Sequence, residues 1–585
     1  MGNISTQLKK TALVLSIICY SSGLSAQIAE SVFRLEPKPW GPVVWESKPP
    51  AGCPVLRSSD LAGIEFTGKS ADYTYADTWY PTWASDGNLY SPYTDGVSGI
   101  WSLARSNKGK YAVTGQARIT GTDPQHLKVE SLGVYPGSAE PYGGRYPCGS
   151  LIHNGIWYYG TYCLDDHPAG YNFGTMGPFV GFRISKDYGK TWIDVPHSCG
   201  DPLFGESRKE GSTVKIGAPH FVDFGQNMEH SPDGKAYLIA HGAMADDPEP
   251  RPANLSWISG DQIYLTRVIP SESTMNDPSK YEYFCGFGKN HEPVWTNDFS
   301  QIRPIFEWNN HCGCVTMTYD ARLKKYIMCV TDGWPTVKYM NTYFLESDQI
   351  VGPWKLISYM EHFGEQGYFV NIPSKFISER GGAGWLSYSG NFSPFPDLDV
   401  NPPGGRYGLI LQQFRFLNHS ELENYPCEMN SIKLEEKRKV WSENNPLTSS
   451  SNKALKARVS VSSVESGYRA EGVNDGVVAG FPVHPGNEWA SKEQKTGAWV
   501  RLEWDKEIKV SKIWLFDRPT ISEQVMAGGI TFSDGTTMLM GELPNAAYSG
   551  KQITFPGKKI KWLEFTVLGV GRASNIGLAE IAVFE

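Results

Sequence analysis

One local pattern, repeated along the chain, restricts the fold more than any other feature of the sequence. Its first copy is residues 76–96, ADTWYPTWASDGNLYSPYTDG, in which two runs of apolar and aromatic residues flank a turn at Ser85–Asn88. An Asp-Gly turn between such runs is a strong signal for a β-hairpin. Because the open ends of an antiparallel hairpin lie side by side, we expect Asp77 and Asp95 to share one rim.

Four further stretches repeat this layout, each with an apolar strand and an aromatic-rich strand around a short turn. They begin roughly every 60 to 90 residues, a spacing that fits four-stranded blades with long loops, and they cover residues 145–166, 220–241, 310–332 and 368–391. Repeats at this period favour a β-propeller, and five hairpins predict five blades. We also expect Ile64–Thr67 to be an early strand that closes the circular array.

The composition agrees with an all-β protein. The chain has 585 residues, which is too long for one core, and it contains 61 Gly, 30 Tyr, 26 Phe and 19 Trp. Its net charge of -8 is mild and forms no basic stripe, so we expect no nucleic-acid partner. The predicted fold class is all-β, with a five-bladed β-propeller followed by a β-sandwich jelly roll.

The first 26 residues are typical of a signal peptide. Lys9 and Lys10 precede the apolar run Thr11–Tyr20, and Leu24–Ala26 offers small residues for cleavage. The apolar run is too short for a stable membrane anchor, and no later stretch reaches transmembrane length. We therefore expect an exported monomer that is secreted, periplasmic or associated with the cell surface.

The remaining chain divides into two domains. Residues 27–440 contain the hairpins and form the predicted catalytic propeller, and residues 441–453 become rich in Ser and Asn, as in a linker. Residues 454–585 carry a second set of strand signals, which include residues 498–504, 512–516 and 577–584.

The order of motifs in this last domain resembles the discoidin, or coagulation-factor type C, jelly roll. Secreted glycosidases carry such domains as carbohydrate-binding modules, so the resemblance implies a β-sandwich that binds glycan. In such modules an Asn-Asp-Gly loop and a terminal Glu help to bind a structural calcium ion, and the matching positions here are Asn474, Asp475 and Glu580. The alternative is a plain turn and a surface acid.

Two motifs in the first domain concern architecture. Residues 185–192, SKDYGKTW, match the Asp-box S-x-D-x-G-x-T-W of sialidases and other propellers. Asp187 is expected to cap a tight turn that Gly189 makes possible, while Trp192 packs between blade strands. Residues 347–354 resemble an outer hairpin of five-bladed arabinanase-type glycosidases.

The paired aspartates of the first hairpin are the main catalytic candidates. Glycoside hydrolysis uses one protonated carboxyl group and one ionised carboxylate, and crowding two acids at a partly buried rim pushes their pKa values apart. Asp77 and Asp95 provide such a pair. This arrangement resembles the propeller glycosidases related to endo-D-arabinanases, which also place paired aspartates on the first blade. The alternative is that each aspartate only caps a turn.

The arabinanase-type pattern has an acid at the first strand of each of the first three blades, and here the match fails. The second and third hairpins begin with Arg145 and His220, so Asp166, or its neighbour Asp165, becomes the third catalytic candidate. The rim of the hairpins supplies the candidate substrate-binding residues: Arg145, His220, His241, His311, Asp332, Glu365, Tyr368, Asn391 and, as a stacking ring, Trp79.

Three functions remain open from the sequence. The first is a glycoside hydrolase that acts on a poly- or oligosaccharide without a catalytic cofactor. The second is a polysaccharide lyase, in which Arg145 would neutralise a uronate and a His or Tyr would remove the proton beside it. The third is a non-catalytic lectin. We favour the hydrolase because it explains the paired acids.

Overall fold

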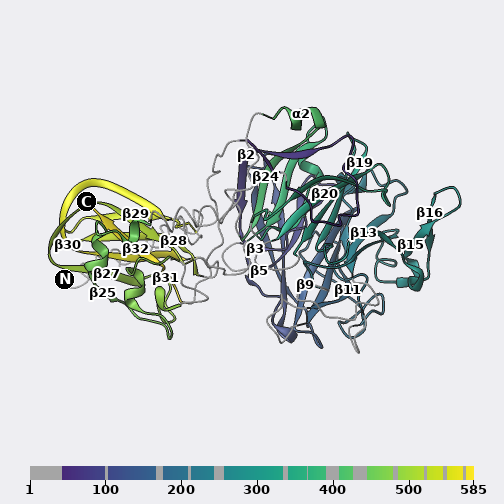
Figure 1. The fold of residues 1–585 in the computed structure, drawn as a ribbon. Helices are drawn as coiled ribbons and strands as arrows, with labels where there is room; N and C mark the ends of the chain where they lie inside the picture. Colours follow the sequence, from purple (N-terminus) through teal and green to yellow (C-terminus); the bar gives the residue numbers. More distant parts are fainter. Residues whose placement is uncertain are drawn as a thin grey trace, which may run out of the picture. The chain divides into compact units, whose positions relative to one another are not determined.

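The computed structural model describes residues 42–45, 47–98, 103–165, 175–207, 213–242, 256–333, 340–364, 366–390, 407–425, 445–478, 485–518, 523–544, 550–570 and 575–585. These residues belong to two compact units, 42–425 and 445–585, called here the N-terminal and the C-terminal unit. Both consist mainly of antiparallel β-sheet, which confirms the all-β class (Figure 1). The predicted signal peptide lies outside the described residues.

The N-terminal unit contains five sheets, and the first two hold the first two predicted hairpins. The first sheet has the order β3-β5-β7-β8, and β4 and β6 also pair with β5. Its strands are β3 (Tyr75–Asp77), β4 (Thr82–Trp83), β5 (Leu89–Val97), β6 (Leu103–Ala104), β7 (Val113–Thr120) and β8 (Lys128–Pro136). The second sheet comprises β9 (Gly144–His153), β10 (Ile156–Asp165) and β11 (Thr175–Ser185).

The third and fourth sheets follow in chain order. The third comprises β12 (His220–Phe221), β13 (Ala236–Gly242), β14 (Gln262–Val268), β15 (Glu282–Phe287), β16 (Pro293–Thr296) and β17 (Pro304–Glu307). The fourth comprises β18 (Val315–Asp320), β19 (Lys325–Asp332), β20 (Asn341–Ser347) and β21 (Lys355–Met360). Short helical turns lie between strands: η1 (Gly109–Tyr111), η3 (Gln226–Met228), η4 (Pro278–Lys280), η5 (Phe299–Gln301), η6 (Ser374–Phe376) and α2 (His419–Glu423).

The fifth sheet joins strands from both ends of the unit. Its order is β1-β2-β24-β23-β22, with bounds β1 (Val43–Trp45), β2 (Gly63–Tyr73), β24 (Leu409–Leu417), β23 (Ala383–Ser389) and β22 (Tyr368–Asn371). The early strand expected at residues 64–67 is thus confirmed, and β2 lies beside β24 (Figure 1). Glu65 on β2 forms an ion pair of 2.8 Å with Arg415 on β24, which reinforces the pairing.

All five predicted hairpins are present, because the local turn signals decide these pairings. The turns lie between β4 and β5, β9 and β10, β12 and β13, β18 and β19, and β22 and β23, and every one of these pairs is antiparallel. None of the sheets closes on itself, and the sheet pairing alone does not confirm a five-bladed propeller. That arrangement is taken up as a proposal below.

The Asp-box packs as its physical chemistry predicts. Asp187 Oδ1 accepts hydrogen bonds from the backbone N–H groups of Lys190 and Thr191, at 3.1 and 2.8 Å. Gly189 has a φ of +89°, and a Cβ there would lie 2.8 Å from the Trp157 ring. Trp192 packs against Trp157 with ring centroids 5.3 Å apart, so the motif secures the edge of the second sheet.

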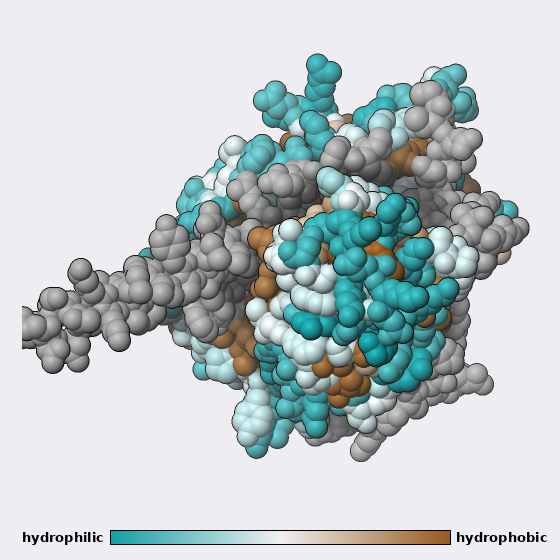
Figure 2. Space-filling model, turned by 90° about the vertical axis from the view of Figure 1, so that its left-hand side faces the viewer, coloured by the Kyte–Doolittle hydropathy of each residue, from teal (hydrophilic) through white to brown (hydrophobic). Residues whose placement is uncertain are grey.

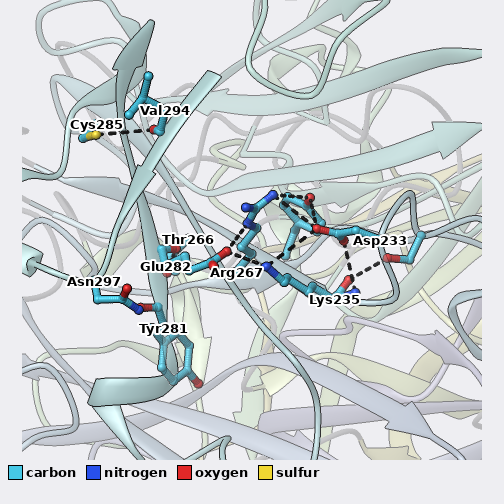
Figure 3. Close-up of polar contacts among 11 residues, drawn as sticks. Asp233, Lys235, Thr266, Arg267, Tyr281, Glu282, Cys285, Val294 and Asn297 are labelled. Carbon is cyan, nitrogen blue, oxygen red and sulfur yellow. Dashed lines mark hydrogen bonds and ion pairs between the residues drawn. The ribbon is translucent and has the colours of Figure 1, made fainter. Parts of the chain in front are cut away.

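A network of ion pairs links three strands of the third sheet (Figure 3). The Glu282 carboxylate accepts hydrogen bonds from Lys235 Nζ and Arg267 Nε, both at 2.6 Å. Arg267 also contacts Asp233 at 3.2 Å, and its guanidinium lies over the Trp295 ring, 4.0 Å from the centroid. These side chains are partly exposed but share partners, so they stabilise the sheet more than isolated surface pairs would.

The C-terminal unit contains one large sheet and a two-stranded ladder. The large sheet comprises β25 (Arg458–Val461), β27 (Trp499–Phe516), β30 (Lys551–Val570), β28 (Val525–Phe532), β29 (Thr537–Gly541) and β32 (Glu580–Phe584), and the ladder pairs β26 (Trp489–Ala490) with β31 (Gly577–Leu578). Short turns are η7 (Pro446–Thr448), η8 (Lys453–Lys456), η9 (Ala470–Val473) and η10 (Pro485–Asn487). The core includes the buried residues Trp489, Leu502, Ile513, Phe565 and Ile581.

The described part of the predicted linker is integrated into this unit. Leu447 is buried against Val478 and Phe516, and Asn452 Oδ1 accepts a hydrogen bond from Val583 N at 2.9 Å. Residues 445–453 therefore pack on this unit through Leu447 and Asn452, and the side chains of Asn445 and Asn452 cap local turns.

Figure 2 shows one face on which hydrophilic residues predominate and hydrophobic ones form separate patches. Leu539 of the C-terminal unit, for example, is 77% exposed. No helix among the described residues has the length and apolar character needed to cross a membrane. The described cysteines are all free thiols, and most are buried.

We predict that removing one buried ring from β2 destabilises the N-terminal unit. Phe66 stacks on Phe363 with ring centroids 5.4 Å apart and contacts Trp45 edge-on. Phe66→Ala should lower the free energy of unfolding by about 3–5 kcal/mol. The exposed Lys69→Ala on the same strand should change it by no more than about 0.5 kcal/mol. Calorimetry of the purified chain gives the comparison, and equal transitions for both variants would contradict the role of β2.

Candidate active site

Asp77 is held in a buried position between the first and fifth sheets. It is the last residue of β3 and is 8% exposed. Tyr368, the first residue of β22, donates a hydrogen bond from its hydroxyl to Asp77 Oδ2 at 2.9 Å. Thr78 Oγ1 donates to Oδ1 at 3.1 Å. The sequence candidates Asp77 and Tyr368 are therefore in direct contact, although 291 residues separate them.

Asp95 lies beside Asp77, as the hairpin predicts. Asp77 pairs with Thr94 across β3 and β5, so Asp95 follows at the same open end. Asp95 has a φ of +45°, which is uncommon for a residue other than glycine and costs conformational energy. Its position is fixed by two bonds: Oδ1 accepts from Ser106 N at 2.9 Å, and its carbonyl accepts from Tyr407 Oη at 2.7 Å.

The two carboxyl groups have different environments. Burial, and to a smaller extent the negative charge of Asp95, raises the pKa of Asp77 to about 7, although the hydrogen bonds from Tyr368 and Thr78 oppose this shift. Asp95 is more exposed than Asp77 and accepts a backbone N–H bond from Ser106. The Asp77 carboxyl group can therefore carry a proton near neutral pH.

Tyrosines that the sequence analysis did not select complete the surroundings of Asp77. Burial raises the pKa of the Tyr80 and Tyr162 hydroxyls well above the usual value, and the charge of Asp77 adds to both shifts. Tyr80 stands three positions after Asp77 in the first hairpin, and Tyr162 lies on β10 of the second. Their positions within the repeated hairpins could have suggested them as site residues. No local pattern in the sequence shows that they lie near Asp77.

His220 and His241 form a neutral, buried pair near this cluster. The Tyr80 ring lies on His220 with centroids 3.8 Å apart. Burial lowers the pKa of His241 to about 4 and that of His220 well below its usual value. Nδ1 of each histidine and Oη of Tyr80 have no hydrogen-bond partner among the described residues. Buried polar atoms in native proteins are generally paired, so these atoms are available to water or a ligand.

A cavity of about 40 Å³ lies where the five sheets meet. Four sheets line the cavity with the first strand of their hairpin, namely β9, β12, β18 or β22. The first sheet lines it with the residues just before β4. Representative lining residues, one from each of the five, are Pro81, Ser150, His220, Thr316 and Asn371. Residues of all five sheets therefore meet at one small cavity.

His311 and Asp332 are also in contact, at the fourth sheet. His311 Nδ1 lies 2.7 Å from Asp332 Oδ2, and the same oxygen accepts a hydrogen bond from Tyr359 Oη at 2.7 Å. The His311 ring packs on Trp308 with centroids 4.4 Å apart. The fully buried Asp332 therefore orients the imidazole of His311.

Two of the sequence candidates do not have the predicted position. Trp79 is 1% exposed, stacks on Tyr93 and donates from Nε1 to Ala76 O, so protein atoms cover the ring that was expected to stack on sugar. Arg145 points away from the Asp77 cluster, since its Nε donates to Thr161 Oγ1 and its Nη1 to Ser138 O. Tyr146, the next residue on β9, instead contacts Tyr162.

The remaining catalytic and binding candidates, Asp166, Glu365 and Asn391, lie outside the described residues. In the C-terminal unit, Glu580 is fully buried, and its Oε2 accepts from Gly476 N at 3.1 Å. Glu580 Oε1 has no hydrogen-bond partner among the described residues. Burial raises the pKa of Glu580 well above its usual value, and the charge of Asp475 adds to this. Asn474 uses its amide N–H to bind Ala454 O at 2.7 Å.

Comparisons with known proteins give a family match for the C-terminal unit only. A family model described as a domain of unknown function (DUF7402) matches residues 452–584. The comparison with curated proteins gives no match.

Several solved structures are similar at low identity. A "putative hydrolase" from Bacteroides ovatus is 14% identical with a TM-score of 0.36, and the match covers 65% of this chain and 98% of that chain. The family 32 carbohydrate-binding module of NanJ from C. perfringens, in complex with galactose, is 19% identical with a TM-score of 0.20 and covers 23% of this chain and 98% of that chain.

The third similar structure, SpGH29, is 14% identical with a TM-score of 0.20 over 27% of this chain. This chain spans only 32% of the length of SpGH29. At these identities and TM-scores, the similarities assign no activity to the chain.

We predict that Asp77 makes the stability of the N-terminal unit depend on pH. Because its pKa in the folded state lies above that of an exposed aspartate, ionising it costs more in the folded than in the unfolded chain. Stability is therefore lost as the pH rises from about 4 to about 7. The neutral variant Asp77→Asn should gain on the order of 3 kcal/mol relative to the native chain across this window.

Urea unfolding of the N-terminal unit at pH 4 and at pH 8 measures this effect. The exposed Asp201→Asn serves as the matched control and should track the native chain at both values. A constant difference between Asp77→Asn and the native chain would mean that folding does not raise the pKa of Asp77.

Proposed function

We propose that the N-terminal unit is a five-bladed β-propeller with the activity of an exported glycoside hydrolase. The five sheets serve as blades, and the cavity to which each contributes marks the central axis. The pairing of β2 with β24 completes the last blade with a strand from the start of the chain. This closure is what the sequence repeats and the Asp-box favour.

The observation that carries the proposed activity is the unequal carboxyl pair of Asp77 and Asp95. Asp77, with its pKa raised to about 7, acts as the general acid that protonates the oxygen of the departing sugar. Asp95, held by Ser106 N, acts as the ionised nucleophile or base. If Asp95 is the nucleophile, it bonds to the sugar as the leaving group departs, and the ionised Asp77 then accepts the proton of the water that breaks this bond. If Asp95 is the base, it takes the proton of the attacking water in a single step.

Neighbouring side chains position this pair and the substrate. Tyr368 fixes the orientation of the Asp77 carboxyl group by donating a hydrogen bond to Oδ2. Thr78 donates a hydrogen bond to the other oxygen, Oδ1. Tyr80 Oη and the Nδ1 atoms of His220 and His241 are unpartnered polar atoms that can bind sugar hydroxyls. The substrate is therefore expected to be a poly- or oligosaccharide.

The lyase alternative has less support. A lyase needs a base that takes the proton beside a uronate and a cation that neutralises the carboxylate. The low pKa values of His220 and His241 make both weak bases, and Arg145 points away from Asp77. A lectin would bind sugar with the same polar atoms but would not need a protonatable aspartate.

The proposal predicts that neither aspartate can be replaced by its amide. Asp77→Asn and Asp95→Asn should each lower kcat by at least about 100-fold, because each removes a proton-transfer or nucleophilic group. Asp86→Asn, at the closed end of the same hairpin, should retain activity and is the matched control. A panel of plant, algal and bacterial glycans, assayed for new reducing ends, identifies the substrate first.

The same assay separates the three functions. Hydrolysis gives reducing ends only, whereas a lyase also produces an unsaturated sugar that absorbs in the ultraviolet. Ultraviolet absorbance that persists in Asp77→Asn and is lost in His220→Ala would favour the lyase. Glycan binding without any cleavage by the native chain would leave the lectin.

We also propose that the C-terminal unit is a carbohydrate-binding module with a structural calcium ion. The buried, unpartnered Glu580 Oε1 and the neighbouring Asp475 carboxylate fit a hard cation, which prefers oxygen ligands. No group of three or more His, Cys, Asp or Glu side chains within the described ranges could hold a metal, so backbone and water oxygens would complete the set. Asn474 would hold the shape of the loop, since its amide N–H donates a hydrogen bond to Ala454 O.

Calcium should therefore stabilise the C-terminal unit. At a concentration about 100 times Kd, binding adds about 2.7 kcal/mol, which corresponds to a rise in Tm of several degrees. Glu580→Gln should abolish the calcium-dependent part of the shift, whereas the exposed Glu507→Gln should keep it. Calorimetry with excess Ca²⁺ and with chelator gives the difference, and identical Tm values for the native chain would refute the site.

A further inference from the structure

A second cavity of the N-terminal unit lies between its first and second sheets. Its volume is about 370 Å³, within the range of pockets that hold a sugar-sized molecule. Its wall includes Tyr135 on β8, Arg145 on β9 and Arg183 on β11, together with Lys110, Asp194 and His197. None of the residues of the Asp77 cluster lines it.

Arg183 is a buried cation in the wall of this cavity. It is 5% exposed, and its guanidinium lies 3.7 Å from the ring centroid of Tyr159 and 4.4 Å from that of Trp192. It donates from Nη1 to Thr114 Oγ1 at 3.2 Å and from Nη2 to Gln116 Oε1 at 2.9 Å. These neutral partners do not neutralise its charge.

Arg183 has no carboxylate in ion-pair contact within the part of the chain that the structure describes. Its Nε also lacks a hydrogen-bond partner there. The cost of burial lowers the pKa of Arg183 to about 10, and the charge of Arg145 adds to this effect. A buried charge costs free energy unless it is paired, so an anion bound in the cavity would stabilise the charge of Arg183.

Two further cations face the same cavity. Arg145 uses Nε and Nη1 on Thr161 and Ser138, and no described residue accepts from its Nη2. Lys110 is exposed at the cavity wall. Against these charges stands one lining carboxylate, Asp194, which already accepts a hydrogen bond from Tyr135 Oη at 2.7 Å.

Packing alone explains only part of this arrangement. Stacking on Tyr159 and Trp192 accounts for the two faces of the Arg183 guanidinium, as in other cation–π contacts. It does not account for Arg145 and Lys110, which bring two more positive charges to the same wall against their mutual repulsion. Three cations around a sugar-sized cavity are instead what recognition of an oxyanion requires.

We propose that this cavity binds a sugar-sized ligand through an oxyanion group, either a carboxylate or a sulfate. Arg145 Nη2 and Lys110 Nζ contact the oxyanion, and Arg183 supplies a fixed positive field from the buried wall. Tyr135 offers an apolar surface for the rest of the ligand. This inference stands independently of the proposed hydrolase, because no residue of the carboxyl pair lines the cavity.

Calorimetric titration of the full chain tests the proposal with defined probes. At low ionic strength, glucuronate and galactose 6-sulfate should bind, and glucose and galactose should bind at least about tenfold more weakly. The stronger binder of the two charged sugars identifies the carboxylate or the sulfate as the natural group. Binding should weaken at high salt, as expected for an attraction between charges.

Matched variants assign the binding to this cavity. Arg145→Gln and Lys110→Gln should each weaken glucuronate or galactose 6-sulfate by about tenfold, whereas the exposed Lys108→Gln should have no effect. Asp194→Asn should tighten binding, since it removes the one carboxylate among the described lining residues. The tighter binding expected for Asp194→Asn still tests the proposal if Arg145→Gln fails to fold.

The carboxyl pair provides the last control. Asp77→Asn should bind the charged probes as the native chain does, which separates this cavity from the candidate active site. Equal affinity for charged and neutral sugars, or unchanged affinity in both Lys110→Gln and Asp194→Asn, would overturn the proposal.

Discussion

The pairing of β2 with β24 is the constraint on which the N-terminal unit depends. The Glu65–Arg415 ion pair across these strands joins residues 350 positions apart. Bringing such distant segments together costs on the order of 5 kcal/mol of chain entropy. Burying Ile64, Phe66 and Phe414 between the sheets offsets this cost, since each large apolar side chain contributes about 1.5–3 kcal/mol.

The same pairing assembles the candidate active site. β2 leads directly into β3, which ends at Asp77, and Tyr407, just before β24, holds the Asp95 carbonyl. β22 of the same sheet supplies Tyr368 to the Asp77 carboxyl group. The fifth sheet therefore supplies a hydrogen bond to Asp77, and the segment that leads into β24 supplies one to Asp95.

The sequence predicts local structure well here and side-chain direction poorly. All five hairpins, and the shared rim of Asp77 and Asp95, follow from turn residues and strand pairing, which are local. Whether Arg145 or Tyr146 faces the centre depends on how β9 is placed against its neighbours, because adjacent strand residues point to opposite faces. The covered ring of Trp79 and the electrostatic influence of Asp77 on Tyr162 are likewise decided by packing between sheets.

Burial, more than charge repulsion, distinguishes the two aspartates. It is the largest cause of the raised pKa of Asp77, ahead of the nearby charge of Asp95. A repulsive pair alone would not decide which partner keeps the proton, since each acts equally on the other. The asymmetry comes from the fold: Asp77 is covered by Tyr368 of the fifth sheet, whereas Asp95 remains partly exposed and accepts a backbone N–H bond. The fifth sheet therefore contributes, through Tyr368, to the surroundings in which Asp77 is protonated more readily than an exposed aspartate.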